Sequence, residues 1–269
     1  MKGGHEMLKI LLCVKQVPKD NHVRTDPVKK TIIRSSGEAV LNRDDGYALE
    51  LAVKLKENCG GRITVITMGA AQASDVLKEC LSKGADEAVL ITDRAFAGSD
   101  TAATSAVLAE AVKALGGADV IICGREASDG NTAQVGPQLA DRLGTALISG
   151  AVSAQTDEGK IRALRLTEDG EETVQAPLPA LLTVRASREE LPMTDLRSVI
   201  AASHAEIREL HLSDLPGIDP ARTGLAGSLT EVVETYAPEK KREAVMLDGS
   251  DPEAAVSELV SQLAGHGLL

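Results

Sequence analysis

The sequence predicts an α/β fold built on a doubly wound, mostly parallel sheet, and two observations support this. Short apolar runs have the composition of strands that are buried on both faces, as parallel sheets require. Amphipathic segments with a helical repeat separate these runs, and each ends at one or two glycines, which commonly stop helices. Alternation of this kind is typical of doubly wound sheets with right-handed crossovers.

The predicted strands and helices follow one another in a regular order up to residue 145. The strand-like runs are 8–14, 62–68, 88–92 and 119–123. The apolar stripes of the predicted helices run from Tyr47 to Leu55, Val76 to Leu81, Thr104 to Leu115 and Val135 to Leu143. Ligands of such sheets bind beyond the carboxyl ends of the strands, so the loops that follow the strands are the first places to look for function.

The pattern changes after residue 145. Residues 160–166 alternate, 168–171 have the composition of a turn, and 172–184 are extended again, which predicts an antiparallel extension of the sheet. From residue 186 the pattern is irregular until a last amphipathic helix begins at Asp251-Pro252. We therefore expect an α/β domain over 1–190 and, over 191–269, an arm that packs on a partner.

Composition excludes several classes of function. The formal net charge of -11 disfavours binding to nucleic acid. No apolar run approaches the roughly 18 to 20 residues that a membrane span requires, and no secretory signal is evident, so we expect a cytoplasmic protein. With two Tyr, one Phe and no Trp, the chain offers little aromatic stacking for a large planar ligand, which suggests that a second subunit contributes to any such site.

The cysteines and histidines indicate neither a metal site nor a catalytic one. Cys13, Cys59, Cys80 and Cys123 lack CxxC spacing, which disfavours zinc or iron–sulfur ligation, and we interpret them as small buried residues. No histidine stands in a triad or a metal-binding spacing. We predict no catalytic residue on this chain, which looks built to bind.

One candidate binding loop covers residues 93–105, where a strand ends and a helix opens. Ser99 or Asp100 has the right chemistry to cap this helix, and capping alone would explain either residue. The alternative is that Thr101, Thr104 and free backbone N–H groups face a pyrophosphate at the helix N-terminus. The sequence leaves both explanations open.

A second candidate loop, residues 124–137, is polar and lies between a strand and a helix that we expect to begin near Thr132. Gly124 permits a close approach of the backbone to a ligand. The loop matches neither the P-loop nor the GxGxxG pattern. Its convergent donors and acceptors, which exceed what capping needs, are Asp129, Asn131, Thr132 and Gln134. Earlier in the chain, Asn42 either caps the first long helix or contacts an adenine edge.

Five longer stretches occur together in this chain. They are Cys13-Val-Lys-Gln-Val-Pro18, Leu41-Asn42 through Tyr47-Ala-Leu-Glu50, Thr67-Met-Gly-Ala-Ala-Gln72, Lys83-Gly-Ala-Asp-Glu-Ala88 and Asp129-Gly-Asn-Thr-Ala-Gln-Val-Gly-Pro137. In this order they resemble the electron-transfer flavoprotein beta subunit family over nearly the whole chain. The resemblance implies a Rossmann-like nucleotide-binding domain over 1–190, a docking loop and C-terminal arm over 191–269, and an alpha subunit with its own FAD.

Family members of the ordinary type hold AMP in this subunit, and those of the electron-bifurcating type hold a second FAD. The two loops look like the bifurcating type, in which NADH reduces this flavin. One electron then goes to ferredoxin or flavodoxin, and the other goes through the alpha-subunit FAD to an acyl-CoA dehydrogenase. The nucleotide contacts that the resemblance implies are Cys13, Asn42, Met68, Asp100, Thr101, Thr104, Gly124, Asp129, Asn131, Thr132 and Gln134.

The segment 193–203 resembles the family's dehydrogenase-docking loop, with Leu196 as its apolar anchor. Relatives continue with Lys or Arg, whereas this chain has Ala201-Ala-Ser-His204, a departure that bears on the choice of dehydrogenase. Two alternatives remain at this point. One is an ordinary electron carrier with structural AMP, and the other is a stand-alone ATP-binding stress-type α/β protein.

Overall fold

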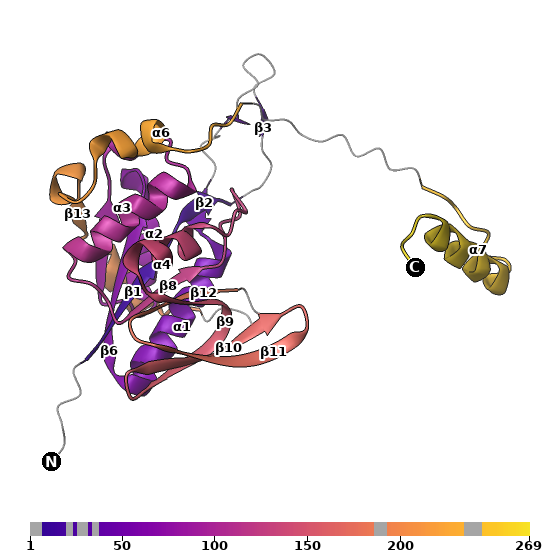
Figure 1. Cartoon of the computed structure of the whole chain (residues 1–269), viewed down its shortest axis with the longest axis horizontal. Helices are drawn as coiled ribbons and strands as arrows, with labels where there is room; N and C mark the ends of the chain where they lie inside the picture. Colours follow the sequence, from indigo (N-terminus) through magenta and orange to yellow (C-terminus); the bar gives the residue numbers. More distant parts are fainter. Residues whose placement is uncertain (1–6, 20–23, 26–31, 34–37, 186–192, 234–243) are drawn as a thin grey trace.

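The computed structural model describes residues 7–19, 24–25, 32–33, 38–185, 193–233 and 244–269. Its centre is a nine-stranded sheet in the order β11-β10-β9-β12-β8-β1-β6-β7-β13, counted over these residues (Figure 1). The strands from β9 to β13 in this order are parallel to their neighbours, and β10 and β11 are antiparallel. The prediction of a mostly parallel, doubly wound α/β sheet is therefore confirmed.

The elements have the following bounds. The strands of the large sheet are β1 (Leu8–Cys13), β6 (Gly61–Met68), β7 (Glu87–Ile91), β8 (Val120–Gly124), β9 (Ala146–Asp157), β10 (Lys160–Thr167), β11 (Gly170–Pro177), β12 (Ala180–Val184) and β13 (Arg208–Leu210). Two small antiparallel pairs are β2 (Gln16–Pro18) with β5 (Ala39–Leu41) and β3 (Arg24–Thr25) with β4 (Ile32–Ile33). The helices are α1 (Arg43–Cys59), α2 (Ser74–Ser82), α3 (Thr101–Ala114), α4 (Val135–Leu143), α5 (Leu196–Ser203), α6 (Gly224–Gly227) and α7 (Pro252–Gly265). Short 3-10 turns are η1 (Ala71–Ala73), η2 (Arg94–Phe96), η3 (Leu212–Asp214) and η4 (Pro220–Arg222).

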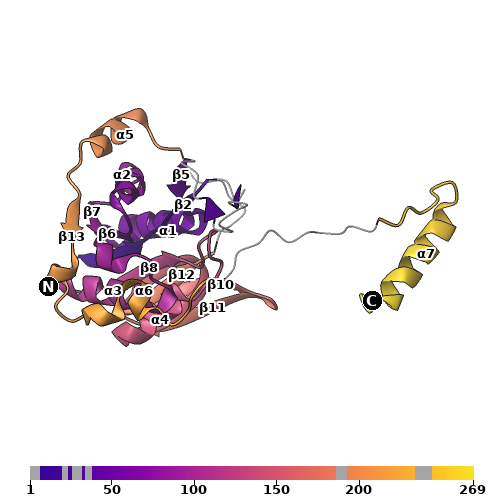
Figure 2. The same ribbon diagram turned by 90° about the horizontal axis from the view of Figure 1, so that it is seen from above.

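Helices cover both faces of the sheet, as Figure 2 shows. Side chains of α1 and α2 pack into one apolar core, and those of α3 and α4 pack into a second core on the opposite face. From β1 the chain proceeds to β6 and β7 on one side, then returns to β8 on the other side of β1. This reversal opens a crevice at the carboxyl ends of β1 and β8, the usual place for a ligand in such folds.

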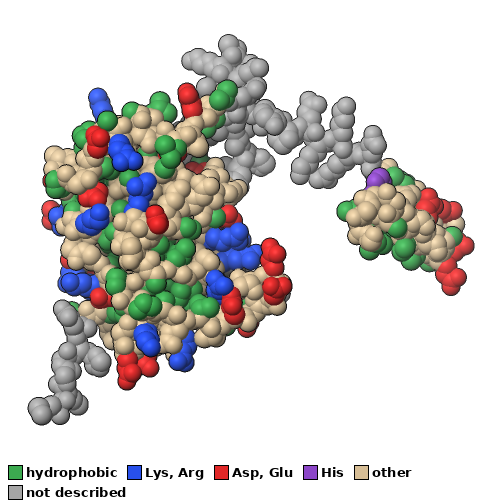
Figure 3. All heavy atoms as spheres, in the orientation of Figure 1, with side chains coloured by type: hydrophobic (Ala, Val, Ile, Leu, Met, Phe, Trp, Pro, Cys, Tyr) green, Lys and Arg blue, Asp and Glu red, His purple; other side chains and the backbone are tan. Residues whose placement is uncertain are grey.

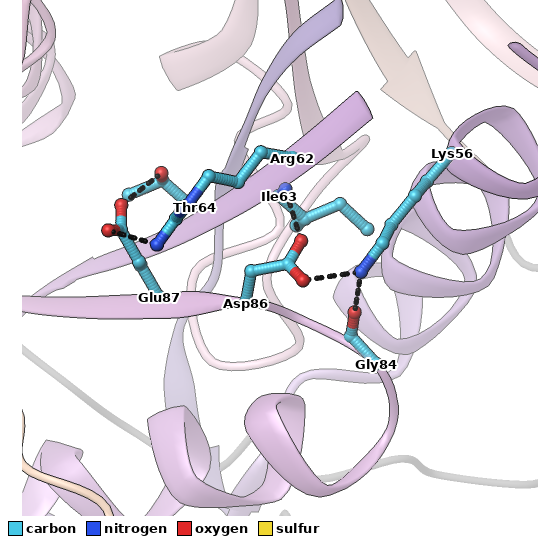
Figure 4. Close-up of polar contacts among 7 residues, drawn as sticks. All are labelled: Lys56, Arg62, Ile63, Thr64, Gly84, Asp86 and Glu87. Atoms are coloured by element: carbon cyan, nitrogen blue, oxygen red, sulfur yellow. Dashed lines mark hydrogen bonds and ion pairs between the residues drawn. The ribbon is translucent and has the colours of Figure 1, made fainter. Parts of the chain in front are cut away.

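At the end of the sheet where the parallel strands begin, the turn before β7 ties the sheet to α1 (Figure 4). Lys56 Nζ contacts Asp86 Oδ1 at 2.5 Å and the carbonyl oxygen of Gly84 at 3.2 Å. The other carboxylate oxygen, Asp86 Oδ2, accepts the N–H of Ile63 at 2.8 Å. These contacts fix the last turn of α1 to β6 and β7. The stretch 83–88 therefore has a structural role at the end of the sheet that lies opposite the crevice.

The region 146–184 differs in part from the prediction. The strands β10 and β11 form the expected antiparallel extension, together with β9. However, β12 does not continue it, because this strand lies parallel between β8 and β9. All five side chains of β12 are buried, which is typical of a central parallel strand with both faces covered. Residues 172–184 are largely extended as predicted, but the prediction that all of them belong to the antiparallel extension was wrong for β12.

The chain beyond residue 193 contains more regular structure than its sequence pattern predicts. β13 adds a parallel strand to the edge of the sheet beside β7, and Leu215 lies in the core beneath α3. The last helix begins where predicted, with Asp251 capping it through the N–H groups of Glu253 and Ala254, both at 3.2 Å.

α7 lies apart from the α/β body in both views, and hydrophobic side chains are visible on its surface (Figures 1, 2 and 3). Val256, Leu259 and Val260 are all exposed. An amphipathic helix with an uncovered apolar face agrees with an arm that packs on a partner, which stays a prediction. Within the described ranges, none of the helices has the length and apolar character needed to cross a lipid bilayer.

Candidate functional site

A cavity of about 330 Å³ lies at the crevice where the strand order reverses. Small-molecule sites commonly measure about 300 to 1,000 Å³, so this one suits a compact ligand or part of a larger one. Within the described chain, none of its lining residues is aromatic. The predicted site residues that line it are Cys13, Asn42, Met68, Asp100, Thr101, Thr104, Gly124, Asn131, Thr132 and Gln134.

Asp129 is the predicted site residue that does not line the cavity. Its carboxylate instead forms an ion pair with Lys15 Nζ at 2.8 Å. Lys15 does line the cavity, so Asp129 contacts a lining residue but is one step removed from the cavity itself. The side chain of Lys15 is half exposed, and an ion pair of this kind contributes little to stability.

The floor of the cavity is held by the carboxylate of Asp45. Asp45 Oδ2 accepts the N–H of Lys15 at 2.7 Å, and Asp45 Oδ1 accepts the N–H of Gly124 at 2.9 Å. These N–H groups follow β1 and end β8, so one buried side chain fixes the spacing of the two strand ends. Burial raises the pKa of Asp45 to about 7, although the hydrogen bonds from Lys15 and Gly124 oppose this shift.

Gly124 allows α1 to approach the end of β8. A Cβ atom at this position would lie 2.2 Å from Asp45 Oδ1 and 2.9 Å from both Asp44 Cβ and the backbone nitrogen of Asp45. Since two of these atoms belong to or adjoin the backbone of α1, a larger residue would push the helix away. Packing of α1 against the end of β8 therefore requires glycine at position 124, independently of any close approach by a ligand.

Asn42 is buried and precedes α1, but it does not cap that helix with its side chain. Its Nδ2 donates to the carbonyl oxygen of Glu126 at 2.8 Å, and its Oδ1 accepts the N–H of Ser128 at 3.2 Å. The capping interpretation was therefore wrong, because the amide is used across the crevice to hold the loop after β8. Asn42 shapes the cavity wall whether or not it also contacts a ligand.

At the start of α3, Asp100 is the capping residue. Asp100 Oδ1 accepts the N–H of Ala103 at 2.9 Å, whereas Ser99 Oγ bonds to the carbonyl oxygen of Phe96 at 2.7 Å. Burial alone would raise the pKa of Asp100, but hydrogen bonds from α3 and from residues 229–230 hold it below its ordinary value. The carboxylate of Asp100 therefore already occupies the N-terminal end of α3.

The start of α4 is different, because no side chain caps it. The helix begins at Val135 and not near Thr132 as expected. Asn131 and Ala133 have φ angles of 47° and 52°, in the left-handed region that interrupts a helix and is costly for residues other than glycine. Val135 and Gly136, the first residues of this uncapped helix end, line the cavity, and such a helix end favours an anion.

A chain of polar contacts joins the two helices across the cavity. Thr101 Oγ1 donates to Gln134 Oε1 at 3.0 Å, and Gln138 Nε2 donates to Thr101 Oγ1 at 3.3 Å. Below them Arg142 Nε donates to the buried Ser105 hydroxyl at 3.0 Å. These contacts fix the helix starts relative to each other and leave the amide of Gln134 on the cavity wall.

The thiols at the cavity are buried and protonated. Burial raises the pKa of Cys13 to about 12 and the pKa of Cys123 well above its ordinary value. A protonated thiol is a poor nucleophile and metal ligand, so these residues act through packing. Cys80 is also buried, as expected, but Cys59 at the end of α1 is exposed, contrary to the prediction.

Comparisons with known proteins agree with this architecture. Residues 29–215 match the family model described as "Electron transfer flavoprotein domain". The chain is 40% identical over 257 residues to "Electron transfer flavoprotein subunit beta" of Thermoanaerobacterium thermosaccharolyticum, which covers 95% of this chain and 98% of that protein. The chain belongs to the electron transfer flavoprotein family.

Two other relatives of this family carry more specific names. "Caffeyl-CoA reductase-Etf complex subunit CarD" of Acetobacterium woodii is 39% identical, with 95% of this chain and 98% of that protein covered. "Protein FixA" of Azotobacter vinelandii is 38% identical, with 94% of each chain covered. Each of these three relatives is therefore matched along almost its full length.

The segment that resembles the docking loop of electron transfer flavoproteins forms α5. Asp195 caps this helix through the N–H of Ser198 at 3.0 Å, and Leu196 is 73% exposed. Val199 and Ile200 are also exposed on the same short helix. The geometry suits an apolar anchor for another protein, and the docking role of Leu196 stays a prediction.

Sequence reasoning missed Lys15, Asp45 and Arg125 as cavity residues of this electron transfer flavoprotein. The sequence contained a signal for Asp45. This carboxylate lies three residues before Ala48 and four residues before Leu49, so helical spacing places it on the buried face of α1. Lys15 and Arg125 directly follow strands, the position from which ligand contacts in these folds usually come.

Proposed function

We propose that this chain is the beta subunit of a cytoplasmic, heterodimeric electron transfer flavoprotein that binds FAD in the cavity at the crevice. Together with an alpha subunit that holds its own FAD, it passes electrons from NADH to ferredoxin or flavodoxin and to an acyl-CoA dehydrogenase. The observation that carries the nucleotide site is the uncapped start of α4 facing a cavity at the topological switch point.

The donors around the cavity fit a phosphate-bearing ligand. The N–H groups at the start of α4 and the Lys15 ammonium would hold phosphate oxygens. The hydroxyls of Thr101, Thr104 and Thr132 supply further donors, and Asn131 supplies an amide. By contrast, Asp100 makes the start of α3 less suitable for an anion, so α4 is the better phosphate end.

The cavity volume bears on which nucleotide binds. About 330 Å³ lies near the lower limit for small-molecule sites and suits an adenylate group. FAD would supply two-electron acceptance from NADH and one-electron transfer to the next carrier. Since no described lining residue is aromatic, a flavin ring would need aliphatic contacts or a surface of the alpha subunit.

The names of relatives support the choice of partners. The relative from Acetobacterium woodii is named for a complex with a caffeyl-CoA reductase, which favours a CoA-ester dehydrogenase as the partner of this chain. The exposed Leu196 and the exposed apolar face of α7 offer separate surfaces for a dehydrogenase and an alpha subunit. The second candidate, a simple carrier with structural AMP, is favoured by the small cavity volume.

Titration of the full chain with AMP and FAD tests the nucleotide site, with Gln134→Glu as the diagnostic variant. Glutamate at this position adds a negative charge beside the proposed phosphate while improving the start of α4, since acidic side chains favour helix N-termini. We expect about a tenfold loss of AMP affinity without loss of stability. Gln155→Glu, on β9 and away from the cavity, is the matched control.

Unchanged AMP affinity in Gln134→Glu would contradict the placement of the phosphate. The electron-transfer role is then tested with the heterodimer, by NADH-driven reduction of ferredoxin in the presence of an acyl-CoA dehydrogenase and its substrate. Ferredoxin reduction that depends on the dehydrogenase substrate is expected, and its absence would favour the simple carrier.

A further inference from the structure

The C-terminal arm is rooted on the rim of the cavity. Residues 224–230, here called the arm root, lie against the loop that precedes α3. The N–H of Leu225 donates to the carbonyl oxygen of Ala97 at 3.0 Å. Gly224 has a φ of +58°, and a Cβ atom there would lie 2.2 Å from the carbonyl oxygen of Ala95. The contact is therefore close, and the arm root occupies a defined position.

Asp100 makes the most concentrated set of contacts with the arm root. Its Oδ2 accepts the N–H of Leu229 at 2.8 Å, the N–H of Thr230 at 3.0 Å and the hydroxyl of Thr230 at 3.1 Å. The N–H of Asp100 donates to Ser228 Oγ at 2.8 Å. One oxygen of this carboxylate thus caps α3, while the other holds the arm root.

The same residue lines the proposed nucleotide cavity, next to Thr101. An anionic ligand at the start of α4 would therefore lie in the same cavity as the negative charge of Asp100. Like charges across a partly buried site repel each other more strongly than in water. The donors of the arm root point their positive ends at Asp100 Oδ2, which offsets part of this negative potential.

We propose that Asp100 is a positioning residue that couples the phosphate of a bound nucleotide to the docking of the arm root. The proposal rests on the nucleotide binding proposed above. When the arm root is docked, its donors reduce the repulsion between Asp100 and the phosphate, so each event favours the other. Thermodynamic linkage requires the effect to be reciprocal.

Amide hydrogen exchange of the nucleotide-free full chain tests the coupling, with AMP as the probe and adenosine as its phosphate-free counterpart. Saturating AMP should slow exchange of the Leu229 and Thr230 amides about tenfold, within the usual range for coupled sites. Adenosine should leave these amides unchanged. The difference between the two ligands isolates the phosphate from the rest of the nucleotide.

Asp100→Asn separates the two contacts that this side chain makes, the cap of α3 and the hydrogen bonds to the arm root. Asparagine caps helices as well as aspartate does, but its Nδ2 cannot accept the three donors of the arm root. In this variant both amides should exchange fast with or without AMP, measured at an AMP concentration that saturates the variant. Asp195→Asn, the same change at the cap of α5, should behave like the wild type.

Thr230→Val is a milder variant that keeps the carboxylate and the cap of α3 and removes one donor. It should reduce the AMP effect even if Asp100→Asn fails to fold. AMP that binds the wild type without slowing exchange at Leu229 and Thr230 would overturn the coupling alone, as would equal protection by adenosine. Failure of AMP to bind the wild type at all would refute the nucleotide site and the coupling with it.

Discussion

Gly124→Ala tests the packing of α1 against the end of β8, on which the cavity depends. The added Cβ atom would lie 2.2 Å from Asp45 Oδ1 and 2.9 Å from the backbone nitrogen of Asp45, so α1 and β8 must move apart. Separation lengthens the 2.9 Å hydrogen bond from the Gly124 N–H to the carboxylate. Overpacking costs about 1–3 kcal/mol, and leaving the buried N–H of Gly124 without its acceptor costs about 1–3 kcal/mol. We therefore expect a loss of about 4 kcal/mol in the free energy of unfolding.

Gly130→Ala is the matched control for this prediction. Gly130 lines the same cavity, and a Cβ atom there would meet nothing within 4 Å. Urea unfolding followed by far-ultraviolet circular dichroism suits a chain that has two Tyr and no Trp. Gly124→Ala should also weaken AMP binding, because the spacing of the strand ends changes. Equal stability of the two variants would refute the reasoning about the floor of the cavity.

Three further predictions concern the cavity and the docking surface. Because burial raises the pKa of Asp45 to about 7, the folded chain holds a proton that the unfolded chain releases, so stability should fall as pH rises from the ordinary carboxyl value to about 7. Asp45→Asn should flatten this trend in urea unfolding at several pH values, and an unchanged trend would count against the buried proton. Leu196→Ala should lower dehydrogenase-linked turnover at least tenfold without changing stability, since the side chain is 73% exposed, and unchanged turnover would exclude it as the anchor. Gly136→Ala should lower the free energy of unfolding by about 2 kcal/mol and weaken AMP binding, because the added Cβ atom would lie 2.5 Å from Thr183 Cγ2. Wild-type stability together with wild-type AMP affinity would show that α4 can shift without cost.

The sequence predicted the fold correctly wherever a single local signal, such as an apolar run or a glycine after a helix, was clear. Continuous apolar runs identified β1 and β8, and glycine stops such as Gly144, which has a φ of +64°, marked the helix ends. The prediction failed at β12, because a short and mostly apolar run next to a hairpin does not reveal which strands it will pair with. Pairing partners are set by packing of the whole sheet, which a local window does not contain.

The candidate site could be located from the sequence but not described in detail. The sequence directed attention to the loops at the carboxyl ends of the strands, and the structure gathers several of them around one cavity. The hydrogen bonds of Asn42 to the loop after β8 join residues that are 84 and 86 positions apart in the chain, and no local rule predicts them. The same holds for Asp100, whose contacts to the arm root span about 130 positions.

The most direct test of the proposed function is the nucleotide content of the purified complex with its alpha subunit. Acid extraction followed by chromatography measures FAD and AMP per heterodimer. We predict two FAD and no AMP, with one flavin held by the cavity at the ends of β1 and β8. One FAD together with one AMP would contradict electron bifurcation and identify the chain as part of a simple electron carrier.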